Sequence, residues 1–417
     1  MAISQNFPNT RPSLNLNFAR SKTLDPRITF SRTNPTATYV DDNGLIVVVG
    51  ADEPRFDHDP TTGESLGLLV EEQRTNLATN NEDLSLWKQN SNPTLNSNDT
   101  VSPDGNTTAD KLTQTSQVFT GVSTDMSGIT TNTVYSCSVF IKPDGDTRTR
   151  FGFYDTSNWQ GSLDTDWSSG EPSTNGSLGG ASDIVYEEHP NGWYRASFKA
   201  STQSNAFAGT VAFYCHPDRT GTGKSAWFWG AQLEAGAFPT SYIPTSGSQK
   251  TRTADNVSMT GTNFSDWYNQ SEGTVYAQFD CDNWNPATDY GKVFAIYENL
   301  GNNVEDNGFW IGNNGPTDDR VRYRVRESGT NQFGPADLTR TTTNIKAAMA
   351  VKSSDFAVTI NGNTPTTSSS GILTSTMDSM TIGKDIPVIG NYLSGHISQL
   401  AYYPTRLSNT VLQTLTK

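Results

Sequence analysis

The sequence contains little charge and no long apolar segment. Charged residues make up 17% of its 417 residues, and the net charge is −14. A negative surface repels the phosphates of DNA and RNA, so we expect no nucleic-acid partner. No apolar run approaches the roughly 20 residues that a membrane span requires, so we expect no membrane insertion. The N-terminal stretch MAISQNFPNTRPSLNLNFARSK lacks the charged and apolar regions of a signal peptide, which predicts synthesis in a cytoplasm without export by the common route.

Cysteine is also scarce. The three cysteines, Cys137, Cys215 and Cys281, are far apart and odd in number. They have no zinc-ligand spacing and suggest no disulfide framework, which fits a reducing compartment. Cys137 falls in an alternating segment and is expected to be a small buried residue.

Helical periodicity is nearly absent, and alternation of apolar and polar residues replaces it. Val134–Ile141, Val321–Arg326 and Phe356–Ile360 alternate, as strands with one buried face do. The last of these continues into Asn361-Gly362, which predicts a hairpin turn. The helix that we expect is short, near the C-terminus, with Ser408 as its N-cap.

Composition divides the chain into three blocks. Residues 1–75 form an N-terminal segment that is rich in Pro, Arg and Asp and has apolar strands at Leu45–Val49 and Leu66–Val70. Residues 76–253 and 254–417 each predict an antiparallel β-sandwich of jelly-roll type, joined by the polar stretch IPTSGSQKTRTADN. The expected fold class is therefore all-β, with two sandwiches and a short C-terminal helix.

The motifs of catalysis are missing. The sequence has no HExxH, G-x-S-x-G, P-loop or G-x-G-x-x-G, and no E-x-D pair of the kind that concanavalin-like glycosidases carry. Glu187 and Glu188 are adjacent and would point to opposite faces of a strand. His58, in the segment FDHDP, is expected in a turn with solvated charges beside it. We therefore expect a protein that is not an enzyme and requires no cofactor.

Aromatic residues among Asn, Asp, Ser and Gly are the candidates for binding a sugar. A pyranose ring stacks on an aromatic face while amides and carboxylates bind its hydroxyls. The glycan-binding candidates are Trp159, Trp167, Trp284 and Tyr290. The alternative for each is contact with a neighbouring subunit. Four other tryptophans lie in strand-like contexts and are expected in the core: Trp193, Trp227, Trp229 and Trp310.

Charged side chains suggest two further sites. Arg322, Arg324 and Arg326 alternate with apolar residues, so they share one strand face that either pairs with acidic neighbours or binds an anionic partner. Acidic turns could contribute oxygen ligands to a structural calcium ion, although such turns also form without metal. They contain Asp104, Asp144, Asp146, Asp318 and Asp319, and the sequence leaves the metal ligands unknown.

Several long motifs resemble a known family. Leu24–Ile46 and Pro54–Asn76 resemble the opening of tailed-bacteriophage virion proteins. Asn76–Trp87 and the string WFWGAQLEAGAFPTSYIPT resemble the first and last parts of a carbohydrate-binding module. Ser271–Asp280 and Gly395–Thr416 resemble the first strand and the end of a concanavalin A-like or laminin G-like domain.

This resemblance implies a structural protein of a phage virion, made in the bacterial host cytoplasm. The expected function is a tail fibre or tail-associated adhesin that contacts host surface polysaccharide. Its N-terminal segment, residues 1–75, would attach the chain to other virion proteins or brace the first sandwich. The chain would form a homo-oligomer, a trimer by analogy with phage fibres. The alternatives are a capsid-decorating or baseplate scaffold without a sugar ligand, and a polysaccharide depolymerase.

Overall fold

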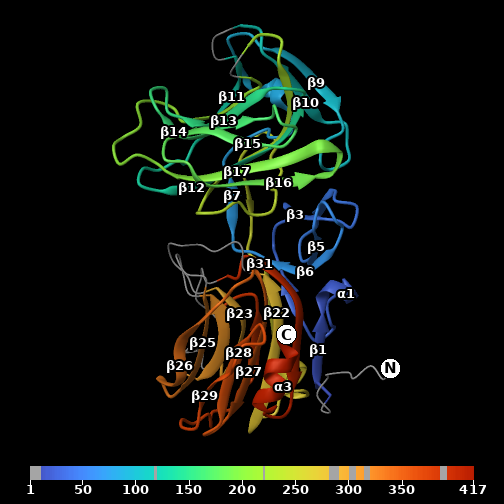
Figure 1. Cartoon of the computed structure of the whole chain (residues 1–417), viewed down its shortest axis with the longest axis vertical. Coiled ribbons are helices and arrows are strands. Elements are labelled where there is room, and N and C mark those ends of the chain that lie inside the picture. Colours follow the sequence, from blue (N-terminus) through green and yellow to red (C-terminus); the bar gives the residue numbers. More distant parts are fainter. Residues whose placement is uncertain are drawn as a thin grey trace.

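The computed structural model describes residues 11–116, 120–218, 221–280, 291–299, 307–313, 320–385 and 392–417. Two β-sandwiches are stacked along the long axis of the molecule, and the N-terminal segment runs beside the second sandwich and reaches their junction (Figure 1). The fold class is all-β, as predicted. Among the described residues, no helix combines the length and the apolar character that crossing a bilayer needs.

The first sandwich consists of two antiparallel sheets. We call one the junction-side sheet, because it faces the second sandwich (Figure 1). In order, its strands are β16 (Ser182–His189), β17 (Trp193–Ser201), β12 (Val134–Asp144), β19 (Ser225–Ala235), β10 (Ala109–Thr113) and β9 (Thr94–Thr100). The other, the distal sheet, comprises β15 (Ser173–Leu178), β14 (Trp159–Asp166), β13 (Arg148–Tyr154), β18 (Ala212–His216), β11 (Gly121–Asp125) and β8 (Lys88–Asn90).

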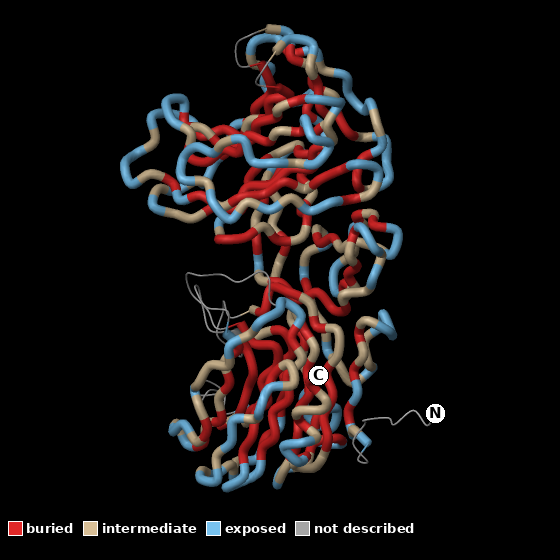
Figure 2. The backbone as a smooth tube through the Cα atoms, viewed as in Figure 1, coloured by how far each residue is buried: buried red, intermediate tan, exposed pale blue. Residues whose placement is uncertain are grey.

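The predicted alternation of β12 is confirmed. Cys137, Val139 and Ile141 are buried in the core between the two sheets. Phe151 and Phe213 of the distal sheet meet them from the other side. Figure 2 shows this buried interior in red, with exposed residues at the loops. Cys137 and Cys215 are free, buried thiols, while Cys281 lies outside the described residues.

The second sandwich includes strands from the N-terminal segment. One sheet has the order β29 (Thr366–Ser368), β28 (Phe356–Ile360), β27 (Asn344–Lys352), β22 (Glu272–Asp280), β31 (Gly395–Tyr403), β6 (Ser65–Val70) and β5 (Arg55–His58), and β1 (Leu14–Asn17) also pairs with β31. The other has the order β2 (Thr29–Ser31), β21 (Asn256–Thr260), β30 (Ser379–Ile382), β23 (Lys292–Tyr297), β24 (Gly308–Asn313), β25 (Arg320–Glu327) and β26 (Thr330–Thr339).

Two local predictions for this sandwich are confirmed. Asn361 and Gly362 have φ of 47° and 72°, and the turn that they form joins β28 to the antiparallel strand β29. The helix α3 (Asn409–Leu415) begins after Ser408, whose side chain accepts a hydrogen bond from the Val411 amide. Leu412 of α3 packs on the outer face of the sheet that contains β27 and β28.

Short elements complete the chain. They are α1 (Phe18–Ser21), α2 (Thr262–Ser265), the 3-10 turns Leu84–Leu86 and Pro190–Gly192, the hairpin of β3 (Ala37–Val40) with β4 (Ile46–Val49), and the pair β7 (Arg74–Asn76) with β20 (Lys250–Arg252). The apolar runs predicted as strands are β4 and β6. The stretch expected to be a polar linker contains β20, whose Arg252 is fully buried.

The prediction for His58 was wrong. His58 ends the strand β5 instead of lying in a turn, and it is buried, with its Nδ1 2.9 Å from the Val40 carbonyl oxygen. Its neighbour Asp57 is also buried. The charged residues around His58 resemble a loop in sequence, but pairing of β5 with β6 places them at the junction.

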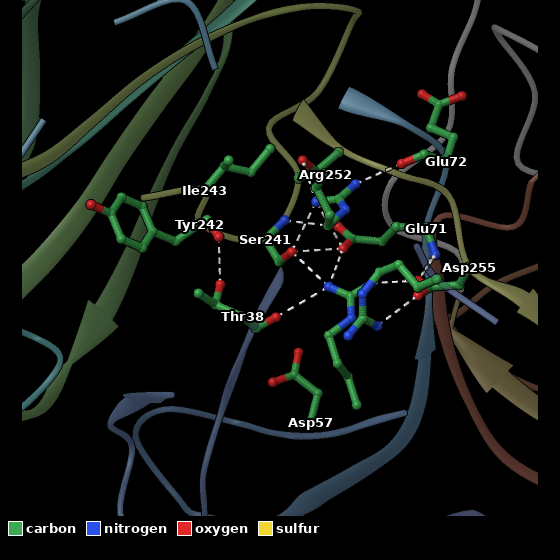
Figure 3. Close-up of polar contacts among 12 residues, drawn as sticks. Thr38, Asp57, Glu71, Glu72, Ser241, Tyr242, Ile243, Arg252 and Asp255 are labelled. Carbon is green, nitrogen blue, oxygen red and sulfur yellow. Dashed lines mark hydrogen bonds and ion pairs between the residues drawn. The ribbon is translucent and has the colours of Figure 1, made fainter. Parts of the chain in front are cut away.

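A buried ionic cluster holds the three parts of the chain together. Arg55 of the N-terminal segment binds Glu71, with Nη1 2.6 Å from Oε2, and also binds Asp255. Arg32 reaches the other oxygen of Asp255 at 3.0 Å, and Arg252 reaches Glu71 at 3.1 Å. Figure 3 shows these contacts converging on Glu71 and Asp255.

The first sandwich joins this cluster through its last loop. The Ser241 amide and hydroxyl donate to the two oxygens of Glu71 at 2.8 and 2.7 Å. Burial alone would raise the pKa of Glu71, but the charges of Arg252 and Arg55 lower it well below its usual range. Glu71 is therefore ionised, and its negative charge binds Arg55 of the N-terminal segment and Arg252 of the stretch between the sandwiches.

Replacing one arginine of the cluster should destabilise the protein strongly. Arg55→Met leaves Glu71 and Asp255 buried with fewer cations, which should cost about 3–5 kcal/mol of unfolding free energy. Urea denaturation followed by tryptophan fluorescence measures this loss. The control is Lys22→Met, which removes an exposed ion pair with Asp42 and should cost less than about 1 kcal/mol. Equal losses of unfolding free energy in the two variants would contradict the stabilising role of the buried cluster.

Candidate functional site

A cluster of aromatic side chains lies on the outward face of the distal sheet. It contains Tyr154 of β13, Trp159 of β14, and Tyr214 and His216 of β18. Neighbours of these residues on the same strands, such as Phe153 and Phe213, point into the core. Because successive strand residues point to opposite faces, Tyr154, Tyr214 and His216 point outward. Trp159 pairs with Tyr154 at a register shift between β13 and β14, and its ring contacts those of Tyr154 and Tyr214 on the same face. We call these four residues the distal aromatic face.

The rings are close together but not coplanar. The centroid of Trp159 is 5.3 Å from that of Tyr154 and 5.8 Å from that of Tyr214. The rings of Tyr214 and His216 are nearly parallel, with centroids 5.9 Å apart. Trp159, Tyr154 and Tyr214 are each partly exposed, whereas His216 is 3% exposed. The three larger rings can therefore be reached from solvent.

A tight turn positions Trp159. Residues 155–158 join β13 to β14, and the buried carboxylate of Asp155 accepts hydrogen bonds from the amides of Ser157 and Asn158. Burial alone would raise the pKa of Asp155, but these amides and that of Ala208 hold it below its usual range. The ionised carboxylate fixes the turn that places Trp159 opposite Tyr154.

Polar groups surround the rings. The Arg150 guanidinium lies over the Trp159 ring, 5.5 Å from its centroid, and binds Asp164 on the next strand, with Nη2 2.5 Å from Oδ2. At the β8 end, the Asn90 amide donates to the Ser123 hydroxyl at 2.9 Å. The face thus combines aromatic rings with donors and acceptors suited to hydroxyl groups.

Two carboxylates also share this face. Asp164 and Asp166 alternate on β14 in a D-x-D arrangement, which differs from an E-x-D pair in its first residue. Asp166 binds Arg148 at 2.8 Å. Hydrogen bonds from Ser168, together with Arg148, lower the pKa of Asp166 to about 2. An acid with that pKa is ionised at neutral pH and is a poor proton donor.

The prediction for Trp167 was wrong. It is 2% exposed and belongs to the core of the first sandwich, where its Nε1 donates to the Thr149 hydroxyl at 3.0 Å. The polar residues around it resemble a loop, but Trp167 continues the inward alternation of Leu163 and Thr165. Trp284 and Tyr290 lie outside the described residues. Trp193, Trp229 and Trp310 are buried as predicted, and Trp227 is partly buried.

The arginine stripe has the predicted alternation. Val321, Tyr323 and Val325 are buried, while Arg322, Arg324 and Arg326 occupy the other face of β25. The Arg322 Nε lies 2.9 Å from Asp337, and the Arg324 guanidinium lies 5.2 Å from the centroid of the Trp310 ring. These contacts agree with the pairing alternative, and an anionic partner for the stripe stays a prediction.

The acidic turns show ordinary turn contacts. Asp104 accepts from the Asn106 amide and the Ser102 hydroxyl, while Asp144 and Asp146 pair with Lys111 and Lys224. Within the described part of the chain, no three His, Cys, Asp or Glu side chains are grouped so that they could hold a metal ion. Asp318 and Asp319 lie outside it.

A cleft of about 1130 Å³ lies between the sandwiches and is a second region of interest. His396 lines it, with Nε2 2.8 Å from Asp57 and Nδ1 bound to Asp280. Burial alone would lower the pKa of His396, but Asp280 and Asp57 raise it well above 6.5. Glu187 and His189 of β16 line the same cleft and pair with each other at 3.2 Å.

The pairing of His396 should stabilise the protein in a pH-dependent way. Because the pKa of His396 is raised in the folded protein, its contribution to the unfolding free energy is complete below about pH 6.5, the pKa of histidine in the unfolded chain. This contribution is lost as the pH rises through the pKa of His396 in the folded protein. The unfolding free energy of the native chain should therefore exceed that of His396→Gln most at about pH 6, and the difference should shrink toward about pH 10. Urea titrations across this range measure the difference. A gap that stays constant with pH would refute this role.

Comparisons with known proteins find similarity in structure alone. No protein-family model matches the chain, and no curated protein matches it significantly. The carbohydrate-binding module CBM40 of the Ruminococcus gnavus IT-sialidase, bound to α2,3-sialyllactose, is 15% identical with a TM-score of 0.30, over 36% of this chain and 84% of that one.

Two further structures are similar at this level. One is a structure of botulinum neurotoxin type C, whose cell entry is described as dependent on interaction with two ganglioside molecules. It is 11% identical with a TM-score of 0.30, over 39% of this chain and 40% of that one. Domains LG4-5 of the mouse laminin α1 chain are 9% identical with a TM-score of 0.21, over 70% and 86%. At such low TM-scores these likenesses carry no argument about function.

Sequence reasoning identified Trp159 and missed its partners. Tyr154, Tyr214 and His216 are outward residues of strands whose inward residues, such as Phe153 and Phe213, are apolar and buried. Their alternation with core residues was a signal that they point outward. The pairing of β13 with both β14 and β18 brings the rings together, and this pairing could not be predicted from the sequence.

Proposed function

We propose that this chain is a non-catalytic glycan-binding protein and that it binds a saccharide on the distal aromatic face. The observation that carries this proposal is a group of partly exposed aromatic rings, centred on Trp159, that takes no part in the hydrophobic core. Isolated exposed apolar residues are ordinary, whereas a contiguous group with polar neighbours is typical of a binding site.

The chemistry of the face suits a sugar. The C–H groups of a pyranose can pack on the rings of Trp159 and Tyr214, while the phenol hydroxyls and Asn90 exchange hydrogen bonds with its hydroxyls. Leu178, 43% exposed, lies opposite Ser162 on the neighbouring strand and adds apolar area to the same face of the sheet. A flat, open face of this kind favours weak binding at each site, which several copies of the chain would strengthen.

The carboxylates on this face support binding without catalysis. Retaining and inverting glycosidases need one carboxylic acid with a raised pKa as proton donor. On this face Asp166 has a lowered pKa, and Asp164 makes two hydrogen bonds to Arg150. Both carboxylates therefore serve to hold arginines in place.

The finer proposal concerns where the protein acts. The likeness of Leu24–Ile46 and Pro54–Asn76 to tailed-phage virion proteins supports a tail fibre or tail-associated adhesin that works as a homo-oligomer on the host surface. A capsid-decorating or baseplate protein is the alternative placement. Antibody labelling of phage particles in the electron microscope should show the chain on the tail, and particles that lack it altogether would overturn the placement.

Removing the central ring should weaken sugar binding without unfolding the protein. Trp159→Ala removes the main stacking surface, so affinity for the oligosaccharides that a glycan array selects should fall about tenfold, equivalent to about 1.4 kcal/mol. Isothermal titration calorimetry measures the loss. The matched control is Trp227→Ala, which removes another partly buried tryptophan, on the junction-side sheet. Its affinity for the same oligosaccharides should stay unchanged. Unchanged affinity in Trp159→Ala would contradict the proposed site.

A further inference from the structure

The charged side chains on the distal sheet occur as matched pairs. Arg148 binds Asp166, Arg150 binds Asp164, and Lys88 binds Asp125. All six residues lie on β8, β11, β13 and β14, around the distal aromatic face. These three cations are therefore balanced by three carboxylates, without a ligand.

The two arginines are the groups that would otherwise bind an acidic sugar. Arg150 is 6% exposed and makes two hydrogen bonds to Asp164, which is 8% exposed. Arg148 binds Asp166 through Nη2, and its Nε and Nη1 lie 3.1 and 3.2 Å from the side-chain oxygen of Asn175 when that amide is oriented to accept them. Both guanidinium groups are thus committed to side chains of the protein itself.

An acidic ligand would have to displace one of these carboxylates. The displaced Asp164 would keep its charge at a site that is almost fully covered, which is unfavourable. The net charge of −14 also repels an anion as it approaches. The partly exposed groups of the distal aromatic face itself are uncharged: the phenols of Tyr154 and Tyr214 and the indole of Trp159.

Building on the proposed function, we infer that the distal aromatic face takes uncharged pyranosides and discriminates against acidic ones. Uncharged hydroxyls can pair with the phenols without disturbing the ion pairs. Since no charge of the ligand is involved, ionic strength should hardly change the affinity.

Matched sugars test this inference directly. We would titrate the full chain with trisaccharides of glucose, mannose and galactose and with the corresponding trisaccharides of glucuronate, mannuronate and galacturonate, which differ at C6. In the pair that binds, the neutral sugar should bind at least about tenfold more tightly, and its dissociation constant should change less than about twofold between low and high salt.

The variant Asp164→Asn should gain affinity for acidic sugars. Asp164→Asn removes the charge that neutralises Arg150, so affinity for the acidic trisaccharide should rise at least about fivefold at low salt and fall again at high salt. Its matched control is Asp183→Asn, which removes a carboxylate paired with Lys199 on the junction-side sheet and should leave both affinities unchanged.

The outcomes separate this inference from the proposed function. If wild-type protein binds the acidic sugar as tightly as the neutral one, and Trp159→Ala weakens both, the site is correct and the discrimination is wrong. If Trp159→Ala changes neither affinity, or if no sugar binds, the proposed function fails and the inference fails with it.

Discussion

The arrangement of the molecule depends on a buried cluster of arginines and carboxylates. Glu71 and Asp255 bind cations that come from the N-terminal segment and from the stretch between the sandwiches, and Ser241 of the first sandwich binds the same Glu71. Charges that are buried this completely are tolerated only when each has partners with good geometry. The cluster therefore forms when all three parts of the chain are in place, which fixes how the sandwiches meet.

This constraint determines which surfaces can bind a ligand. At the junction, the outward residues Phe140, Trp193 and Trp229 of the junction-side sheet are covered by Ile46 and Tyr242. The outer face of the sheet containing β27 is partly covered by α3. The distal sheet faces away from the junction (Figure 1), so its aromatic residues stay accessible while the rest of the first sandwich is anchored. Binding on a rigid sheet requires little ordering of the protein, which favours recognition by an otherwise shallow face.

Much of the fold could be predicted from the sequence, because alternation and turn chemistry act locally. The β12 strand and the Asn361-Gly362 hairpin are examples. Predictions failed where local composition and long-range pairing disagree. Trp167 has loop-like neighbours but continues the inward row of β14 one residue beyond its end, and His58 belongs to a strand whose other residues include Arg55 and Asp57. The candidate site was predictable only as Trp159, since its meeting with Tyr214 requires strands about 55 residues apart to share a sheet.

The central claim is that the distal aromatic face binds a sugar. A crystal structure of the chain with a bound neutral oligosaccharide tests it most directly, because it locates the ligand without depending on how a variant folds. The account predicts a pyranose ring packed against Trp159, with the Arg150–Asp164 pair intact. A sugar bound in the cleft beside His396, or on the arginine face of β25, with the distal aromatic face bare, would contradict it.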